Sequence, residues 1–201
     1  MIMKEAVQIK TYQSPAFDIN EAIRYLGDKN PTEATVSLIE KRLPEVEGEL
    51  MYKVAYRAFD VSVSCDAVEF PFVKIYSKNL AKCLFGCTRA IVFCATVGPR
   101  VDRLILKYSS ILPSVALTVD AIATERVEAL CDAFCDELRQ SGVALTPRFS
   151  PGYGDLPLIH QRDIFCALDL PGKIGVTLNE SLLMSPSKSV TAIAGIKPGQ
   201  N

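Results

Sequence analysis

A short segment that begins at residue 148 combines residue types that could hold a charged small molecule. Arg148 offers a planar guanidinium fork that can bind a carboxylate through two parallel hydrogen bonds. Pro151 stiffens the chain, and Gly152 has no Cβ to keep a ligand away from the backbone. Tyr153 adds an aromatic face and a hydroxyl, which suit a cationic or heteroaromatic group. On composition alone, an ordinary proline–glycine turn beside an arginine explains the same residues.

The long helix expected before this segment carries acidic side chains that could face a ligand ammonium. Helical periodicity predicts a helix over residues 114–140, closed by Gly142. Glu125 and Glu128 lie on its acidic side, opposite an apolar side that contains Val127 and Leu130. Acidic residues on a long helix are more often its solvated face. A binding role for these two carboxylates therefore needs support from elsewhere in the chain.

The remaining sequence predicts an α+β chain whose strands cluster in the middle and return at the end. A continuous apolar run at residues 90–95 is typical of a strand buried on both faces. Asp18, with Glu21 three residues later and Gly27 beyond, predicts a short helix with a capping box. The other expected elements are a helix after Pro31 that kinks or breaks at Pro44, strands within 52–76, a helix near 99–108, a helix at 159–168, and strands at 174–178 and 190–196.

Composition excludes several classes of function. The chain has 201 residues, 22% of them charged, and a formal net charge of -1 with no basic stripe, so we expect no nucleic-acid binding. No apolar run approaches the ~20 residues of a membrane span, and the first residues lack a signal-peptide core, which predicts a cytoplasmic protein. The seven cysteines include helically spaced pairs, Cys83 with Cys87 and Cys131 with Cys135, which we interpret as buried thiols rather than a metal site.

Arg148, three spacer residues and then Gly152-Tyr153 resemble the S-adenosylmethionine-binding signature of the activation domain of cobalamin-dependent methionine synthase. The segments 175–181 and 184–190 resemble the closing part of that domain, and 95–99 and 127–130 resemble its short stand-alone relatives. The matches extend over about half of the chain, and residues 1–80 contain none. The resemblance implies one activation-domain-like unit over residues 1–201, with residues 1–50 as a helical N-terminal part. It also implies an α+β fold in which a twisted, largely antiparallel sheet is flanked by helices.

The resemblance further implies a role in reactivating a corrinoid. In that family the domain holds S-adenosylmethionine over a cobalamin in the inactive Co(II) state, and an electron from a flavodoxin-like donor and a methyl group restore methylcobalamin. Carried onto this sequence, Arg148 holds the methionine carboxylate, and Glu128, with Glu125 behind it, faces the ammonium. The implied ligand-binding set is Arg148, Ser150, Pro151, Gly152, Tyr153, Glu128 and Glu125. The protein contributes binding and orientation, and we do not expect it to turn over alone.

The sequence departs from the family pattern at two positions: one lies in the ligand-binding segment, and the other bears on the partner. Gly154 stands where larger family members often have proline, and His160 is not in the motif that supplies the cobalt ligand. The corrinoid is therefore expected on a separate polypeptide, namely a cobalamin-dependent methionine synthase that lacks its own activation domain. The alternatives are a partner of another corrinoid methyltransferase, an interaction protein that has lost the ligand, and a self-sufficient methyltransferase. The last lacks support, because no glycine-rich strand–helix turn of the usual methyltransferase fold is present.

Overall fold

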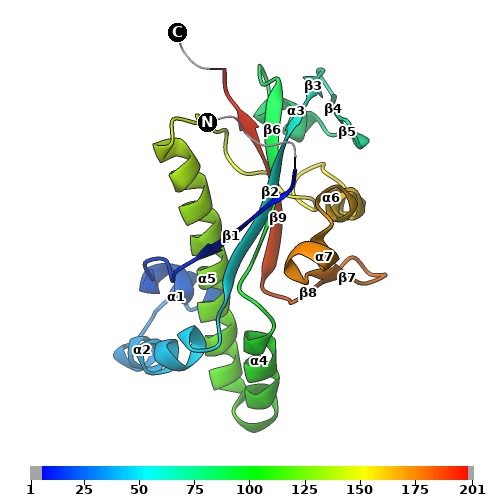
Figure 1. Ribbon diagram of the computed structural model, residues 1–201. Coiled ribbons are helices and arrows are strands. Elements are labelled where there is room, and N and C mark those ends of the chain that lie inside the picture. The colour runs from blue at the N-terminus through cyan, green and yellow to red at the C-terminus, as the bar shows by residue number, and fades with distance from the viewer. Residues whose placement is uncertain (1–5, 199–201) are drawn as a thin grey trace.

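A four-stranded antiparallel sheet forms the centre of the computed structural model, which describes residues 6–198 (Figure 1). Its strands lie in the order β1 (Gln8–Tyr12), β2 (Tyr52–Asp60), β6 (Arg89–Thr96) and β9 (Ser189–Ile196). The ends of the expected unit 1–201 and the residues read for a signal peptide, at 1–5 and 199–201, lie outside the described residues. Each neighbouring pair of strands is antiparallel, which confirms the predicted fold class.

Strand β6 is the buried middle of the molecule. All of its residues from Ala90 to Thr96 are buried, because β2 and β9 flank it and helices cover both faces of the sheet. Side chains alternate between the faces, so that Phe93 and Ala95 pack toward one cluster of core residues and Val92 and Cys94 toward the other. The continuous apolar run therefore predicted this element correctly.

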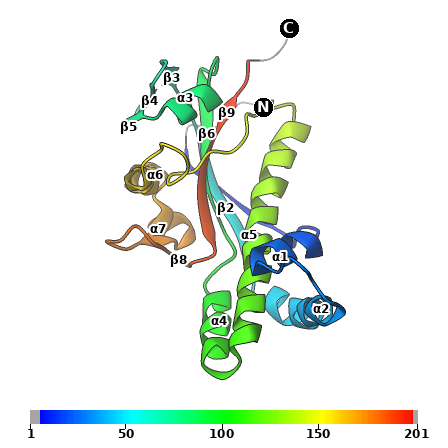
Figure 2. The ribbon, with the colours of Figure 1, turned by 180° about the vertical axis from the view of Figure 1, so that it is seen from behind.

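One face of the sheet packs against a layer of helices dominated by α5 (Pro113–Gln140) (Figure 2). Helix α4 (Arg100–Ile111) forms a hairpin with α5, and α1 (Ile19–Leu26) and α2 (Glu33–Glu47) pack on the other side of α5. Helix α5 has 28 residues and begins with a proline, which is tolerated in the first turn. This long helix holds its acidic side chains at fixed positions along the sheet.

The opposite face carries smaller elements that build a second core cluster. Helix α6 (Gln161–Leu168), preceded by the 3₁₀ turn η1 (Leu158–His160), packs there through Ile164, Phe165 and Leu168. The other elements on this side are α3 (Lys78–Cys83), β3 (Ser62–Val63), β4 (Ala67–Phe70), β5 (Val73–Tyr76), α7 (Leu170–Ile174), β7 (Thr177–Leu178) and β8 (Met184–Ser185). The strand expected at 174–178 is thus wrong in its first half, where α7 ends at Gly175 with φ 72°.

The N-terminal part is mostly helical, with differences from the sequence-based expectation. Strand β1 at the edge of the sheet was not expected. Asp18 caps α1 and Gly27 ends it as predicted, but the capping-box carboxylate is not Glu21. Instead, Glu125 of α5 accepts a hydrogen bond from the Asp18 backbone N–H at 3.1 Å. Helix α2 continues past Pro44 to Glu47 rather than breaking.

The part of the chain between residues 6 and 198 lacks two features. None of its helices combines the length and the apolar character that a membrane span requires. It also holds no cluster of three or more His, Cys, Asp or Glu side chains arranged to bind a metal ion.

Candidate functional site

The segment that carries Arg148 is fixed to the free edge of strand β9. Phe149 and Ile193 exchange both backbone hydrogen bonds, at 2.9 and 2.8 Å, and Thr146 N–H donates to the Gly195 carbonyl at 2.9 Å. These two anchors flank Arg148 and hold its backbone beside the sheet. Its guanidinium reaches back to α5, the helix that precedes the segment in sequence. The position of Arg148 thus follows from strand pairing rather than from the turn alone.

Beyond Phe149 the chain folds into a compact bend. The Gly152 N–H donates to the Leu156 carbonyl at 2.9 Å, and the Tyr153 N–H donates to the Ser150 carbonyl at 3.2 Å. Gly152 has a φ of 92°, in the region that favours glycine, and a Cβ there would lie 3.2 Å from a methyl group of Leu158. The bend therefore requires glycine at this position, as its place in the sequence suggested.

Asp155 ties the far end of the bend to helix α3. Its carboxylate accepts hydrogen bonds from the Ser77 hydroxyl and from the backbone N–H groups of Lys78 at 2.8 Å and Asn79 at 3.2 Å. The Ser77 hydrogen bond, followed by those from the backbone, lowers the pKa of Asp155 below its ordinary value. The bend is thus held at both ends, by β9 and by α3.

A cavity of about 620 Å³ opens between this bend, α5, α6 and the free edge of β9. Four of the residues of this segment that were predicted to bind the ligand line it: Arg148, Ser150, Pro151 and Tyr153. The structure therefore brings these side chains together with Glu128 of α5, while Gly152 shapes the bend behind the wall. The complete lining is Glu128, Arg148, Phe149, Ser150, Pro151, Tyr153, Gln161, Met184, Ser189, Val190 and Thr191.

Arg148, in the cavity wall, contacts two carboxylates: Glu128 in the same wall and Asp132 in the adjoining depression. Arg148 donates to Glu128 at 3.1 Å and to Asp132 at 2.7 Å. Burial alone would lower the pKa of the Arg148 guanidinium, but the neighbouring Cys131, Asp132 and Glu128 raise it above its ordinary value. Glu128 and Asp132 are one helical turn apart, so both can contact the same guanidinium. This part of the site therefore presents a positively charged guanidinium and negatively charged carboxylates in direct contact.

Tyr153 occupies the rim of the cavity. Its side chain is 69% exposed, which is unusual for a large aromatic residue. The bend turns the ring outward while its backbone hydrogen bond to Ser150 keeps its position fixed. The face of an exposed ring beside a cavity is already accessible, so a flat or cationic ligand can stack on it without any rearrangement of the protein.

Glu125 is not among the residues that line this cavity. It is 3% exposed and forms an ion pair of 2.5 Å with Arg126, which has no exposed surface. Arg126 also pairs with Glu47 of α2 at 3.1 Å and donates to the Pro15 carbonyl at 2.8 Å. Glu125 lines an adjoining depression between α1 and α5, together with Glu128, Asp132 and Arg148. The structure thus places this carboxylate in a network that joins α1, α2 and α5.

His160 lies at the end of η1, where its Nδ1 is 2.8 Å from a carboxylate oxygen of Asp163. It does not line the cavity described above. This local pairing, between residues three apart, accounts for the position of the imidazole.

Sequence reasoning did not single out several residues of the cavity wall. Met184, Ser189 and Val190 fall in the closing segment whose resemblance was noted, so a signal for them was present. Gln161 and Thr191 had no comparable signal, because Gln161 starts a helix and Thr191 sits within an apolar strand. Only the packing of α6 against the edge of β9 brings these two into one wall.

Comparison with known proteins agrees with this architecture. No model of a known protein family matches the sequence, and a search of curated proteins finds no match. Among solved structures, the chain is similar to the crystal structure of the MetH reactivation domain bound to AdoHcy, with a TM-score of 0.73 and 14% sequence identity. The alignment covers 98% of this chain and 80% of the other. At this level of identity the likeness establishes a shared fold: a mixed α+β domain with antiparallel strands flanked by helices, like that of the MetH reactivation domain.

Proposed function

We propose that this chain binds S-adenosylmethionine in the cavity beside Arg148 and supports the reductive methylation of a corrinoid held by a separate methionine synthase. The observation that carries the proposal is the contact between Arg148 and Glu128, at 3.1 Å, in the wall of a cavity rimmed by Tyr153. The structural neighbour, a reactivation domain with AdoHcy bound, supports the same assignment.

The charges of the site complement those of the amino-acid end of this ligand. A guanidinium has five N–H donors, and Arg148 uses one for Glu128 and one for Asp132. The remaining N–H groups can donate hydrogen bonds to a ligand carboxylate while both ion pairs persist. Glu128 has a side chain 33% exposed and so keeps an accessible carboxylate for an ammonium group. An α-amino acid can thus place its two charges on Arg148 and Glu128 with each one paired.

The size and shape of the cavity also suit the ligand. A volume of about 620 Å³ lies within the ~300–1,000 Å³ range of sites for small molecules and cofactors. Phe149, Pro151 and Met184 add apolar and aromatic groups to the lining of the cavity. The exposed ring of Tyr153 lies at the rim, where a sulfonium or an adenine can contact its face.

The chain's contribution to the reaction is binding and orientation. The reactivity would come from the ligand and the partner: S-adenosylmethionine would give up its methyl group and leave as S-adenosylhomocysteine, and the partner's corrinoid, reduced by one electron from a flavodoxin-like donor, would accept the methyl group. Arg148 and Glu128 hold the amino-acid end, and the bend anchored at β9 and α3 holds the rim residues in place. The corrinoid and its cobalt ligand belong to the partner, so this chain acts in trans.

Two measurements test the proposal. Isothermal titration with S-adenosylmethionine should show binding, and thermal melting should show stabilisation that grows with ligand concentration. A methionine synthase that lacks its activation domain, trapped as Co(II), should recover activity when this chain, a flavodoxin-like donor and S-adenosylmethionine are added together. No binding at millimolar ligand refutes the proposal. Binding without recovery of that enzyme refutes the methionine synthase as client and points to another corrinoid methyltransferase.

A further inference from the structure

We propose that Gln161 and Thr191 recognise the nucleoside half of the bound ligand, as a neutral hydrogen-bonding end of the cavity opposite the charged end at Arg148. The inference deepens the proposed function and rests on it. Both residues line the cavity, and both are buried, with exposed fractions of 6% and 2%.

The first observation is that both side chains hold a polar atom without a partner. Gln161 Oε1 and Thr191 Oγ1 are buried and make no hydrogen bond within residues 6–198. Buried polar atoms in folded proteins are almost always paired, because leaving one unpaired costs its lost hydration. Four such atoms occur in the described chain, and two of them belong to the wall of this one cavity. A ligand that supplies hydrogen bonds there relieves that cost.

The second observation concerns the backbone of Thr191. In an antiparallel ladder, alternate residues direct both their N–H and C=O to the same side of the strand. Ile193 directs its pair toward Phe149, at 2.8 and 2.9 Å, so Thr191, two residues earlier, directs its pair the same way. On that side of β9, the pairing within the described residues ends at the Phe149–Ile193 bridge. The open edge therefore offers a peptide donor and acceptor beside the two unpaired side chains.

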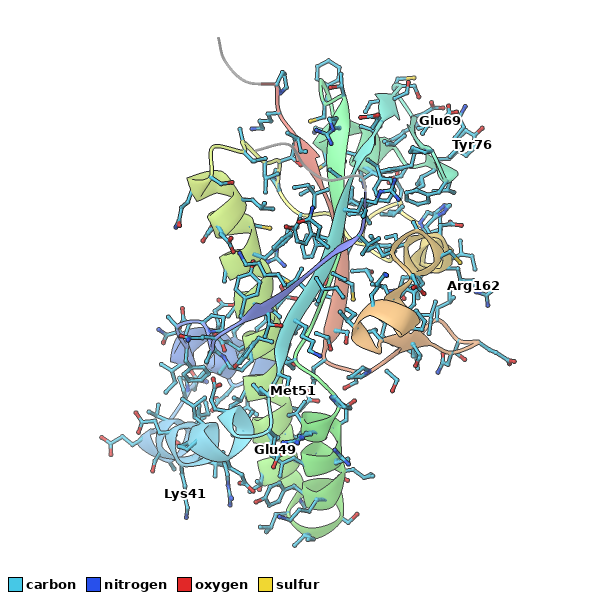
Figure 3. All side chains as sticks on the ribbon, viewed as in Figure 1. Lys41, Glu49, Met51, Glu69, Tyr76 and Arg162 are labelled. Carbon is cyan, nitrogen blue, oxygen red and sulfur yellow. The ribbon has the colours of Figure 1, made fainter. Side chains whose placement is uncertain are left out.

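Gln161 is held firmly in its wall. It begins α6, whose next residue, Arg162, lies on the outer side of the helix (Figure 3). The following residues Ile164 and Phe165 anchor α6 in the second core cluster, against the sheet. The packing of α6 thus fixes the backbone of Gln161, and rotation about its terminal torsion lets the carboxamide present either its oxygen or its nitrogen to a ligand.

The two ends of the cavity differ in charge and in the face of the sheet from which they come. Arg148 and Glu128 belong to the α5 side and carry full charges. Thr191 shares its face of β9 with Ile193, on the α6 side, where Gln161 also lies and where the wall groups are neutral. A molecule with a zwitterionic amino acid at one end and a neutral nucleoside at the other has the same division. The cavity therefore orients such a ligand, with the nucleoside toward α6.

The test separates the two halves of the ligand. Isothermal titration, with ligand-observed NMR for weak binding, would compare S-adenosylhomocysteine with 5′-methylthioadenosine, which has the nucleoside but no amino acid. The variants are Gln161→Met and Thr191→Val, which keep side-chain size and remove polarity, and Arg148→Ala. Gln140→Met, at an exposed position on α5 outside the cavity, is the matched control. Thermal melting verifies that each variant folds.

Gln161→Met and Thr191→Val are each expected to weaken both ligands by about tenfold or more, the range for a lost buried hydrogen bond. Arg148→Ala should weaken S-adenosylhomocysteine and leave 5′-methylthioadenosine unchanged. If Gln161→Met and Thr191→Val bind both ligands as the control does, or lose only S-adenosylhomocysteine, the inference is overturned while the Arg148 result still supports the proposed function. If the wild-type protein binds neither ligand, the proposed function and the inference fail together. If one polar-deletion variant does not fold, the other decides.

Discussion

Replacing Arg148 with alanine should weaken S-adenosylmethionine binding by about 2–4 kcal/mol, or roughly 30- to 900-fold in Kd. The magnitude follows from the state of the guanidinium. Its side chain is only 23% exposed, so a ligand carboxylate would meet it in a largely desolvated wall, where truncating one partner of a charged pair is costly. The existing contacts with Glu128 and Asp132 occupy two donors, which keeps the estimate below that for a wholly unengaged arginine.

The same substitution should cost little stability. Asp132 is 65% exposed and Glu128 is 33% exposed, so both carboxylates regain hydration when the guanidinium is removed. We therefore expect the melting temperature of the free protein to change little, while its ligand-induced increase is largely lost. A binding defect without a folding defect distinguishes a ligand contact from a structural ion pair.

The assay is isothermal titration, with Arg139→Ala as the matched control. Arg139 also bonds an aspartate of α5, Asp136 at 2.6 Å, but lies outside the cavity lining. The control should bind S-adenosylmethionine as the wild type does. An Arg148→Ala protein with unchanged affinity would refute the placement of the carboxylate, and equal losses in both variants would show that the effect is not specific to the cavity.

The remaining predictions concern the bend and the buried network. Tyr153→Ala should weaken S-adenosylmethionine binding by titration, whereas Tyr153→Phe should be mild, because we expect the ligand to contact the exposed aromatic ring, which phenylalanine keeps. Gly152→Ala should cost about 1–3 kcal/mol in chemical unfolding and weaken binding, because φ 92° strains a residue with a Cβ; wild-type behaviour would contradict the requirement for glycine. Glu125→Ala should cost about 3–5 kcal/mol of unfolding free energy, because it leaves Arg126 buried with one carboxylate fewer, yet leave affinity unchanged where folded; lost affinity in a stable variant would place Glu125 in the binding site. The pKa of Asp155 is lowered in the fold, so its stabilising contribution is complete above its ordinary value of 3.8 and is lost as the pH falls through the folded pKa. Asp155→Asn should therefore flatten the decline of melting temperature below about pH 4, and parallel wild-type and variant curves would argue against this.

Local chemistry in the sequence was sufficient to predict several elements. Asp18 and Gly27 mark the ends of α1 because capping and left-handed termination depend on residues within one turn. The apolar run of β6 and the periodicity of α5 identify elements whose burial pattern repeats along the chain. Strand β1 and helix α7 were missed, because β1 depends on pairing at the edge of the sheet and α7 on packing against β2 and α6.

The sequence by itself determined that a stiff proline–glycine bend places Tyr153 a fixed distance along the chain from Arg148, since backbone conformation at Gly152 is a local property. The tertiary structure decided which carboxylate Arg148 contacts. Glu125 and Glu128 are only three residues apart on α5, yet Glu128 contacts Arg148 and lines the cavity, whereas Glu125 pairs with Arg126. It also decided that Gln161 and Thr191 share a wall. The physical reason is that contacts between distant segments depend on how the helices pack against the sheet and the edge of β9. The spacing of residues along the chain does not specify that packing.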